Sequence, residues 1–301
     1  MKTQLKADLA LILITLFWGV SNVLTKIGLG DIAEFNLIAL RFVIAFGLAI
    51  IVFWKRVRKS NWRTVRYAAT IAGILFAVFA FMTFGLRHTT ASNAVFLTCL
   101  ASIFIPIINF IFLKQKPQAK VLVSIVLALI GVGLLSFQGK FQLNVGDILC
   151  VLCSIAFAVH IIVTEKYTQK VDSVSLGVLQ LGFVGLYSLV ASFVFEIPTL
   201  PTTALSWSVV IVLSIFCTAI AFIVQTVAQK YTDSIHTGLI FTLEPVFGAF
   251  FAFLFLNEIL TAQGYLGGIL LIISIVLVEV DFKSLNIPIV TKLFSQKPLQ
   301  D

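Results

Sequence analysis

Long apolar segments alternate with short polar breaks along the whole chain, and most of these segments are apolar on every face. A helix in a soluble protein would carry a polar stripe, so the pattern indicates helices surrounded by lipid. Each segment has about 17–23 residues, enough to cross a hydrocarbon core of about 30 Å. The pattern predicts ten spans: Leu9–Leu29, Ala33–Phe53, Tyr67–Leu86, Ala91–Leu113, Val121–Phe137, Gly146–Glu165, Ser175–Phe195, Trp207–Ala228, Ser234–Leu256 and Ala262–Val280.

The second half of the chain echoes the first at a constant offset of 143 residues. Thr89–Phe137 and Thr232–Val280 share one plan, two apolar segments around a short polar break, and Leu113 falls on Leu256. A fixed-offset echo is typical of an internal repeat. We therefore expect two copies of one five-span unit.

Lysine and arginine gather on one side of the predicted membrane. The loop Trp54–Arg66, the loops after the even-numbered spans and both termini carry nearly all of them, whereas the other side has only Arg87 and Lys140. This bias predicts that both termini are cytoplasmic and that the chain is a multi-pass protein of the plasma membrane.

The odd number of spans in each unit means that the second copy must enter the membrane upside down. The predicted fold class is therefore an all-α membrane protein with ten transmembrane helices in two inverted five-helix repeats. The repeats are residues 1–140 and 141–282, and 283–301 form a short cytoplasmic tail. Inverted repeats of this kind hold a binding site near the bilayer midplane, between the halves.

The composition agrees with this picture. Apolar residues make up 60% of the chain and charged residues 11%, against about 25% charged in soluble proteins. The net charge of +8 follows from the basic loops, so no nucleic-acid partner is expected. All four cysteines lie inside apolar segments and are interpreted as small apolar side chains; no metal and no cofactor is predicted. Triad, zinc-protease, phosphate-loop and dinucleotide signatures are absent, which disfavours an ATP-driven pump and most enzymes.

Several short sequence elements follow one another in a characteristic order: Phe17–Gly19, Arg41, Leu86–Ser92, Thr242–Val246, Asn257–Thr261, Gln263 and Gly267. Together they resemble the drug/metabolite transporter superfamily, in particular its ten-helix EamA-type members, from Ala10 to about Val280. The resemblance implies two inverted five-helix bundles and export of small metabolites, with amino acids a common case. In one departure, Gln115 and Lys116 stand where the first copy usually has an acidic residue, while Glu258 keeps it in the second copy.

Arg41 lies about eight residues into the second span, roughly 12 Å deep, where insertion of an arginine costs about 2.5–3.5 kcal/mol. It is expected either to bind a substrate carboxylate or phosphate or to pair with Glu244. Glu244 lies near the middle of the ninth span and is either a ligand or proton site or a buried structural carboxylate. Pro245 and Pro106 are the predicted bending points.

The other candidate binding residues are Trp18, Asn22, His160, Gln180 and His236. Trp18 and Asn22 share one stripe of the first span and are expected to line a cavity, or, for Asn22, to join helices. Gln180 in the seventh span is interpreted as the repeat counterpart of Arg41 in the second span. The two histidines are either proton relays or hydrogen-bonded core residues. His236 is expected to lie on the same helix face as Glu244, eight residues further on.

The predicted function is a secondary transporter that exports a small polar metabolite, an amino acid or a similar amphiphile, by alternating access. Its partners are the substrate and the lipid bilayer; the substrate gradient and proton exchange are alternative drives, and an oligomer is compatible with the sequence. The alternatives are an intramembrane enzyme that uses His160, His236 and Glu244, and a membrane-embedded sensor or binding subunit.

Overall fold

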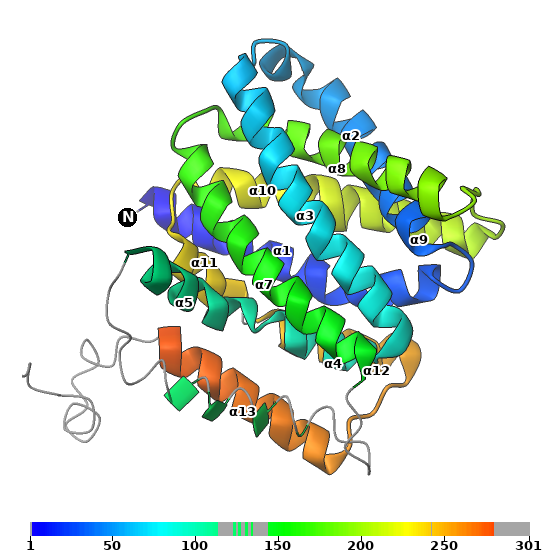
Figure 1. The fold of residues 1–301 in the computed structure, drawn as a ribbon, viewed down its shortest axis with the longest axis vertical. Helices are drawn as coiled ribbons and strands as arrows, with labels where there is room; N and C mark the ends of the chain where they lie inside the picture. Colours follow the sequence, from blue (N-terminus) through cyan, green and yellow to red (C-terminus); the bar gives the residue numbers. More distant parts are fainter. Residues whose placement is uncertain are drawn as a thin grey trace, which may run out of the picture.

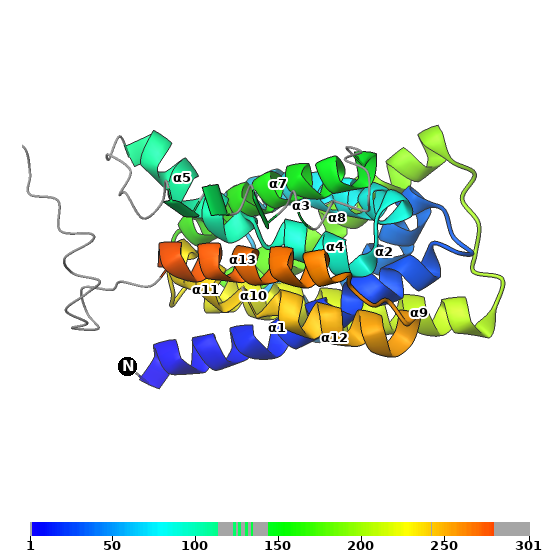
Figure 2. The same cartoon turned by 90° about the horizontal axis from the view of Figure 1, so that it is seen from below.

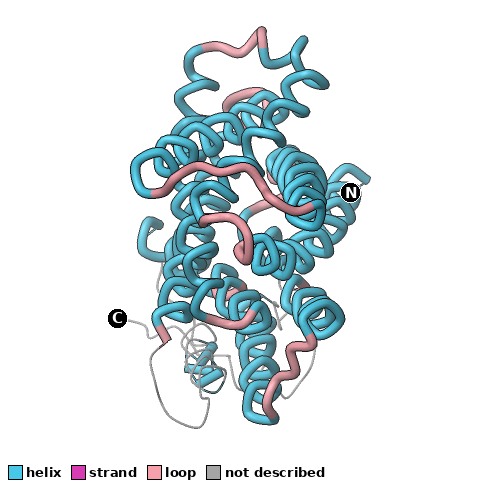
Figure 3. The backbone as a smooth tube through the Cα atoms, turned by 90° about the vertical axis from the view of Figure 1, so that its right-hand side faces the viewer, coloured by secondary structure: helices cyan, strands magenta, loops and turns pink. Residues whose placement is uncertain are grey.

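The computed structural model describes residues 2–113, 144–241 and 243–279, together with scattered positions between 123 and 134. Within these ranges the chain is helical and forms no strand (Figure 3). Seven of the described helices are long and apolar enough to cross a membrane. The chain is therefore an all-α, multi-pass membrane protein. The predicted fifth span lies largely outside the described residues, as does the predicted tail 283–301.

The helices of the first half follow the predicted spans, except that the fourth span is divided in two. They are α1 (Lys2–Gly28), α2 (Glu34–Val57), α3 (Trp62–His88), α4 (Ala91–Thr98) and α5 (Ala101–Leu113). The second half contains α7 (Val145–Thr168), α8 (Ser173–Phe195), α9 (Ala204–Ser214), the π-helix η1 (Ile215–Ile220), α10 (Ala221–Ala228), α11 (Ser234–Phe241), α12 (Glu244–Leu256) and α13 (Ala262–Glu279).

The polar breaks between the spans supply the helix caps. The side chains of Asn61, Thr90, Asn144, Asp172 and Thr203 each accept a hydrogen bond from a backbone N–H two or three residues further on. Such a bond satisfies one of the N–H groups that a helix start leaves free, and a lost cap costs about 1 kcal/mol. The short polar segments of the sequence thus fix where the apolar helices begin.

The fourth and ninth spans are broken at the same place. A shift of 143 residues turns the bounds of α4 and α5 into those of α11 and α12. Pro245 follows the second break, but Ser102 holds the equivalent position after the first. Since both helices break there, proline is not the common cause. Pro106 lies inside α5, beyond the break, and its role as a bending point stays a prediction.

The two broken helices run in opposite directions (Figure 1), with α5 packed against α11 and α4 against α12. Next to the breaks, Ser102 Oγ donates to the carbonyl of Gly238 (2.9 Å). Toward one end, Asn109 Nδ2 near the end of α5 lies 3.5 Å from Ser234 Oγ at the start of α11.

The packing partners of the helices repeat between the halves. The helix α1 packs against α9–α10 and against α11–α12, whereas α7 packs against α3 and against α4–α5. The helices α2 and α8 pack against each other. Viewed from below, the helices lie side by side in a broadly common direction (Figure 2).

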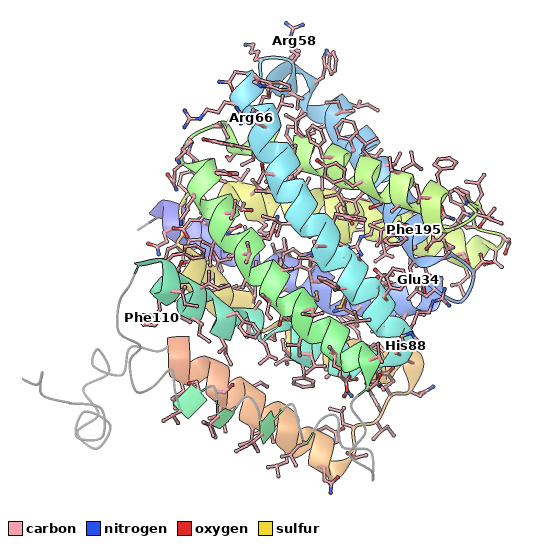
Figure 4. The ribbon with its side chains drawn as sticks, in the orientation of Figure 1. Glu34, Arg58, Arg66, His88, Phe110 and Phe195 are labelled. Carbon is pink, nitrogen blue, oxygen red and sulfur yellow. The ribbon has the colours of Figure 1, made fainter. Side chains whose placement is uncertain are left out.

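Positive charge gathers at one end of the bundle. Arg58 and Arg66 lie at that end, and Glu34, His88 and Phe195 lie at the opposite one (Figure 4). We call these the basic end and the distal end.

Candidate functional site

A cavity lies between the two halves of the bundle, and the centre of a water molecule can occupy about 70 Å³ of it. This is several times the roughly 10–15 Å³ that one water needs. Its walls come from α1, α2, α3 and α4 of the first half and from α7, α10 and α12 of the second. The lining residues are Trp18, Ser21, Asn22, Thr25, Arg41, Val78, Phe79, Met82, Thr83, Thr98, Cys153, Phe157, Phe222 and Glu244. The structure thus brings together four of the sequence-predicted site residues: Trp18, Asn22, Arg41 and Glu244.

Arg41 is buried, with 3% of its surface exposed. Its Nη2 donates to the carbonyl of Cys217 (3.0 Å), its Nε donates to Thr218 Oγ1, and its guanidinium carbon lies 4.7 Å from the ring centre of Phe79. The cation is therefore held by neutral polar groups and a ring face, and none of these contacts neutralises its charge. The predicted alternative of an ion pair with Glu244 is wrong, since no such pair forms within the described residues.

The π-helical turn η1 supplies the carbonyl that orients this arginine. At its end, the amide of Ala221 donates to the carbonyl of Thr218 rather than to that of Cys217, four residues back. The Cys217 carbonyl instead accepts from Trp18 Nε1 (3.2 Å) as well as from the arginine. Single π turns are frequent at functional sites, because they turn backbone groups away from the regular ladder. The apolar sequence gives no signal for this turn.

Glu244 is the first residue of α12, directly after the helix break, and is partly buried. Asn22 Nδ2 donates to its Oε1 (3.3 Å). A helix N-terminus favours a carboxylate, because the unpaired N–H groups there carry partial positive charge. Pro245 occupies the first turn of α12, where no N–H is needed, so it starts a helix rather than bending one.

Aromatic rings form a wall around Trp18. Its ring centre lies 5.7 Å from that of Phe157, 5.2 Å from that of Phe222 and 4.9 Å from that of Phe241. Together with the polar groups, this wall makes an apolar cavity with a few fixed donors and acceptors, as small-molecule sites usually are.

His160 and Gln180 meet each other behind this wall rather than in the cavity. His160 Nε2 lies 3.3 Å from Gln180 Oε1, and Gln180 Nε2 donates to Thr226 Oγ1 (2.9 Å). The imidazole stacks near Phe157, with ring centres 6.1 Å apart. Both residues support the cavity wall, and neither lines the cavity.

His236 lies away from the cavity. Its Nε2 is 3.3 Å from Asp8 Oδ2, and 38% of its side chain is exposed. The helix break separates it from Glu244, so the predicted shared face of one continuous helix does not exist. Sequence periodicity could not have shown this, because no proline or glycine stands between Thr98 and Ser102, where the equivalent first-half span breaks.

Glu258 links three helices at the distal end, a role that the sequence reading missed. Its Oε1 accepts from Lys26 Nζ and from the amide of Ala91, and its Oε2 accepts from the amide and the hydroxyl of Ser92, all at 3.1 Å. These contacts join the ends of α1 and α12 to the start of α4. Lys26 directly follows Thr25, which lines the cavity.

The pKa of Glu258 lies below its usual value of 4.5. Burial is the largest influence and raises the pKa, but the backbone amides of Ser92 and Ala91 and the charge of Lys26 together outweigh it. The carboxylate is therefore ionised at neutral pH, the form that accepts these hydrogen bonds.

Comparison with known proteins assigns the chain to a family. The profile of the EamA-like transporter family matches residues 5–137 and 144–280. An uncharacterized transporter from Archaeoglobus fulgidus is 30% identical over 284 residues, which cover 92% of this chain and 86% of that protein. The uncharacterized transporter YoaV of Bacillus subtilis is 24% identical over 279 residues, covering 89% of this chain and 94% of YoaV.

A crystal structure of a protein with 18% sequence identity superposes with a TM-score of 0.70, covering 93% of this chain and 99% of the other. That likeness shows a shared fold. The chain thus belongs to the EamA-like transporter family and is a membrane transporter.

Proposed function

We propose that this transporter is a secondary carrier that exports a small polar metabolite, an amino acid or a similar amphiphile, across the plasma membrane by alternating access. The observation that carries the proposal is the cavity between the halves, where Arg41 and Glu244 face one space beside an aromatic wall. In this proposal ten helices form two inverted units, residues 1–140 and 141–282, with both termini in the cytoplasm.

The broken helices support the inverted relation between the units. The pairs α4–α5 and α11–α12 share lengths and break positions and lie antiparallel. The packing of α1 against helices of the second half and of α7 against the equivalent helices of the first half agrees with the same two-fold relation. Two halves that pack around one cavity can rock against each other without unfolding either unit.

The charges of the cavity favour a zwitterion. Arg41 uses two of its five N–H donors for its described bonds, and the rest of the fork can receive a substrate carboxylate. Glu244 offers a carboxylate to an ammonium group. The rings around Trp18 would take an apolar side chain.

The closed distal end supports loading from the basic end. Glu258 fastens α12 to α1 and α4 on the far side of the cavity from Arg58 and Arg66. With the basic end in the cytoplasm, this conformation is the one that would receive a substrate for export.

Counterflow in proteoliposomes tests the carrier. Vesicles loaded with one unlabelled amino acid at a time should accumulate the radiolabelled form transiently and saturably, and Arg41→Gln should abolish the accumulation. Arg58→Gln, which removes one arginine outside the cavity, is the matched control and should transport normally. Linear uptake without saturation for every amino acid, amine, nucleoside and carboxylate tried would refute the carrier.

A further inference from the structure

A hollow at the basic end lies apart from the cavity, between the start of α3 and the end of α7. The centre of a water molecule can occupy about 450 Å³ of it. It is lined by Trp62, Arg63, Arg66, Tyr67, Thr70 and Tyr167.

Two arginines and two stacked tyrosines build this hollow. The rings of Tyr67 and Tyr167 are stacked with their centres 3.9 Å apart. Arg63 Nε donates to the hydroxyl of Tyr67 (3.0 Å), and its guanidinium carbon lies 5.3 Å from the ring centre of that tyrosine. Arg66 stands three residues further along the same helix, on the same side. The tyrosines thus hold one guanidinium in place beside the other.

Within the part of the chain that the structure describes, no acidic side chain balances the positive charge in the hollow. No carboxylate lines it, and neither Arg63 nor Arg66 forms an ion pair with any residue that the structure describes. Paired guanidinium groups bind phosphate oxygens through charge-assisted hydrogen bonds.

A neighbouring hollow on the other side of the α2–α3 turn differs in this respect. It is of similar size, about 340 Å³, and contains Arg56 and Lys59, but also Asp172. The Asp172 carboxylate lies 3.8 Å from Arg56 Nη1 and also accepts from Ser175. Its charge is partly balanced already, so it is the poorer anion site.

The depth of the first hollow points to a lipid. The helix α3 has 27 residues and is about 40 Å long, longer than a hydrocarbon core of about 30 Å. At least one end of α3 therefore extends to the level of the head groups. The exposed Trp62 (73%) and Trp54 (56%) mark the same level, where tryptophan is enriched.

We propose that this hollow binds a phosphate ester, and that an anionic phospholipid of the leaflet at the basic end supplies it. Arg63 and Arg66 contact the phosphate, Thr70 and the tyrosine pair line the side toward the bundle, and Trp62 lies beside the acyl chains. In the proposed membrane orientation this leaflet is the cytoplasmic one. Lipid binding itself does not depend on that orientation, and its test involves no transport.

Thermal unfolding of the full-length protein in dodecyl maltoside, titrated with dioleoyl phosphatidylglycerol, tests the proposal. The Tm should rise to a plateau, because the lipid binds the folded state. In Arg63→Gln/Arg66→Gln the apparent affinity should fall on the order of 100-fold, because each lost charge-assisted hydrogen bond to the phosphate costs about 1.5 kcal/mol, roughly a tenfold factor. Lys55→Gln/Arg58→Gln, which removes two charges from the same end outside both hollows, should bind like the native protein.

Three results would overturn the proposal. An equal loss in both double variants would mean diffuse attraction by the basic end. An equal Tm rise with phosphatidylcholine would mean that the charge plays no part, and an equal rise with glycerol 3-phosphate would assign the hollow to a soluble ester. The native Arg66 side chain makes no hydrogen bond within the described residues, so Arg66→Gln should fold. This single variant should weaken binding about tenfold and carries the test if the double variant does not fold.

Discussion

Replacing Glu258 by glutamine is expected to loosen the distal end of the transporter. The substitution keeps the shape of the side chain and one acceptor oxygen. It removes the negative charge, which accepts hydrogen bonds from two backbone N–H groups at the start of α4 and from Lys26. A hydrogen bond to a charged group contributes about 1.5–3 kcal/mol, whereas the ion pair adds less than about 1 kcal/mol, since 30% of the Lys26 side chain is exposed. A net loss of about 2 kcal/mol would shift the balance between closed and open distal ends about 30-fold.

A native thiol can report this opening. Cys153 lines the cavity and is 2% exposed. In the proposed orientation the distal end faces the outside of the cell. In a background where Cys99, Cys150 and Cys217 are alanine, a membrane-impermeant methanethiosulfonate added outside cells should therefore label the protein slowly. Glu258→Gln should raise the labelling rate by up to about 30-fold, because the distal end then opens more often.

Glu34 provides a matched control for this experiment. It lies at the same end, its Oε1 is 2.6 Å from Arg87 Nε, and its side chain has the same exposed fraction as that of Glu258, 16%. Its ion pair joins α2 to α3 within one half, so Glu34→Gln should leave the labelling rate unchanged. An unchanged rate in Glu258→Gln, or an equal rise in Glu34→Gln, would refute the reasoning.

Three further predictions concern pH, packing and the site. Because the pKa of Glu258 is lowered, its stabilising contribution is complete above about pH 4.5 and is lost as the pH falls through the lowered value; the Tm difference between native protein and Glu258→Gln should therefore shrink in acid. Gly19→Ala should lower the Tm, at a cost of about 1–3 kcal/mol, since the new Cβ would lie 2.6 Å from Phe247 Cβ, whereas Gly47→Ala meets nothing within 4 Å and should not. Arg41→Lys keeps the charge but loses the fork, so counterflow should fall at least about tenfold; normal counterflow would remove the arginine from the site.

The apolar pattern determined the membrane helices. In lipid, the backbone can satisfy its polar groups only within helices, so length and hydropathy sufficed to place most spans within a few residues. The same cost of burying polar groups singled out Arg41 and Glu244, because a charge in such a segment needs a cavity or a partner. The two residues do line one cavity.

Only the tertiary structure decided which groups these side chains meet. The carbonyl that orients Arg41 belongs to Cys217, and the amides that Glu258 binds lie at Ala91 and Ser92, all on segments far away in the sequence. His236 has the right spacing from Glu244 but lies across a helix break. Where every face of a helix is apolar, periodicity cannot tell an inward side chain from an outward one, and the two breaks share no residue type that could signal them. The sequence alone could therefore propose a few residues of the cavity, whereas their partners, the π turn and the contacts of Glu258 follow from packing between distant segments.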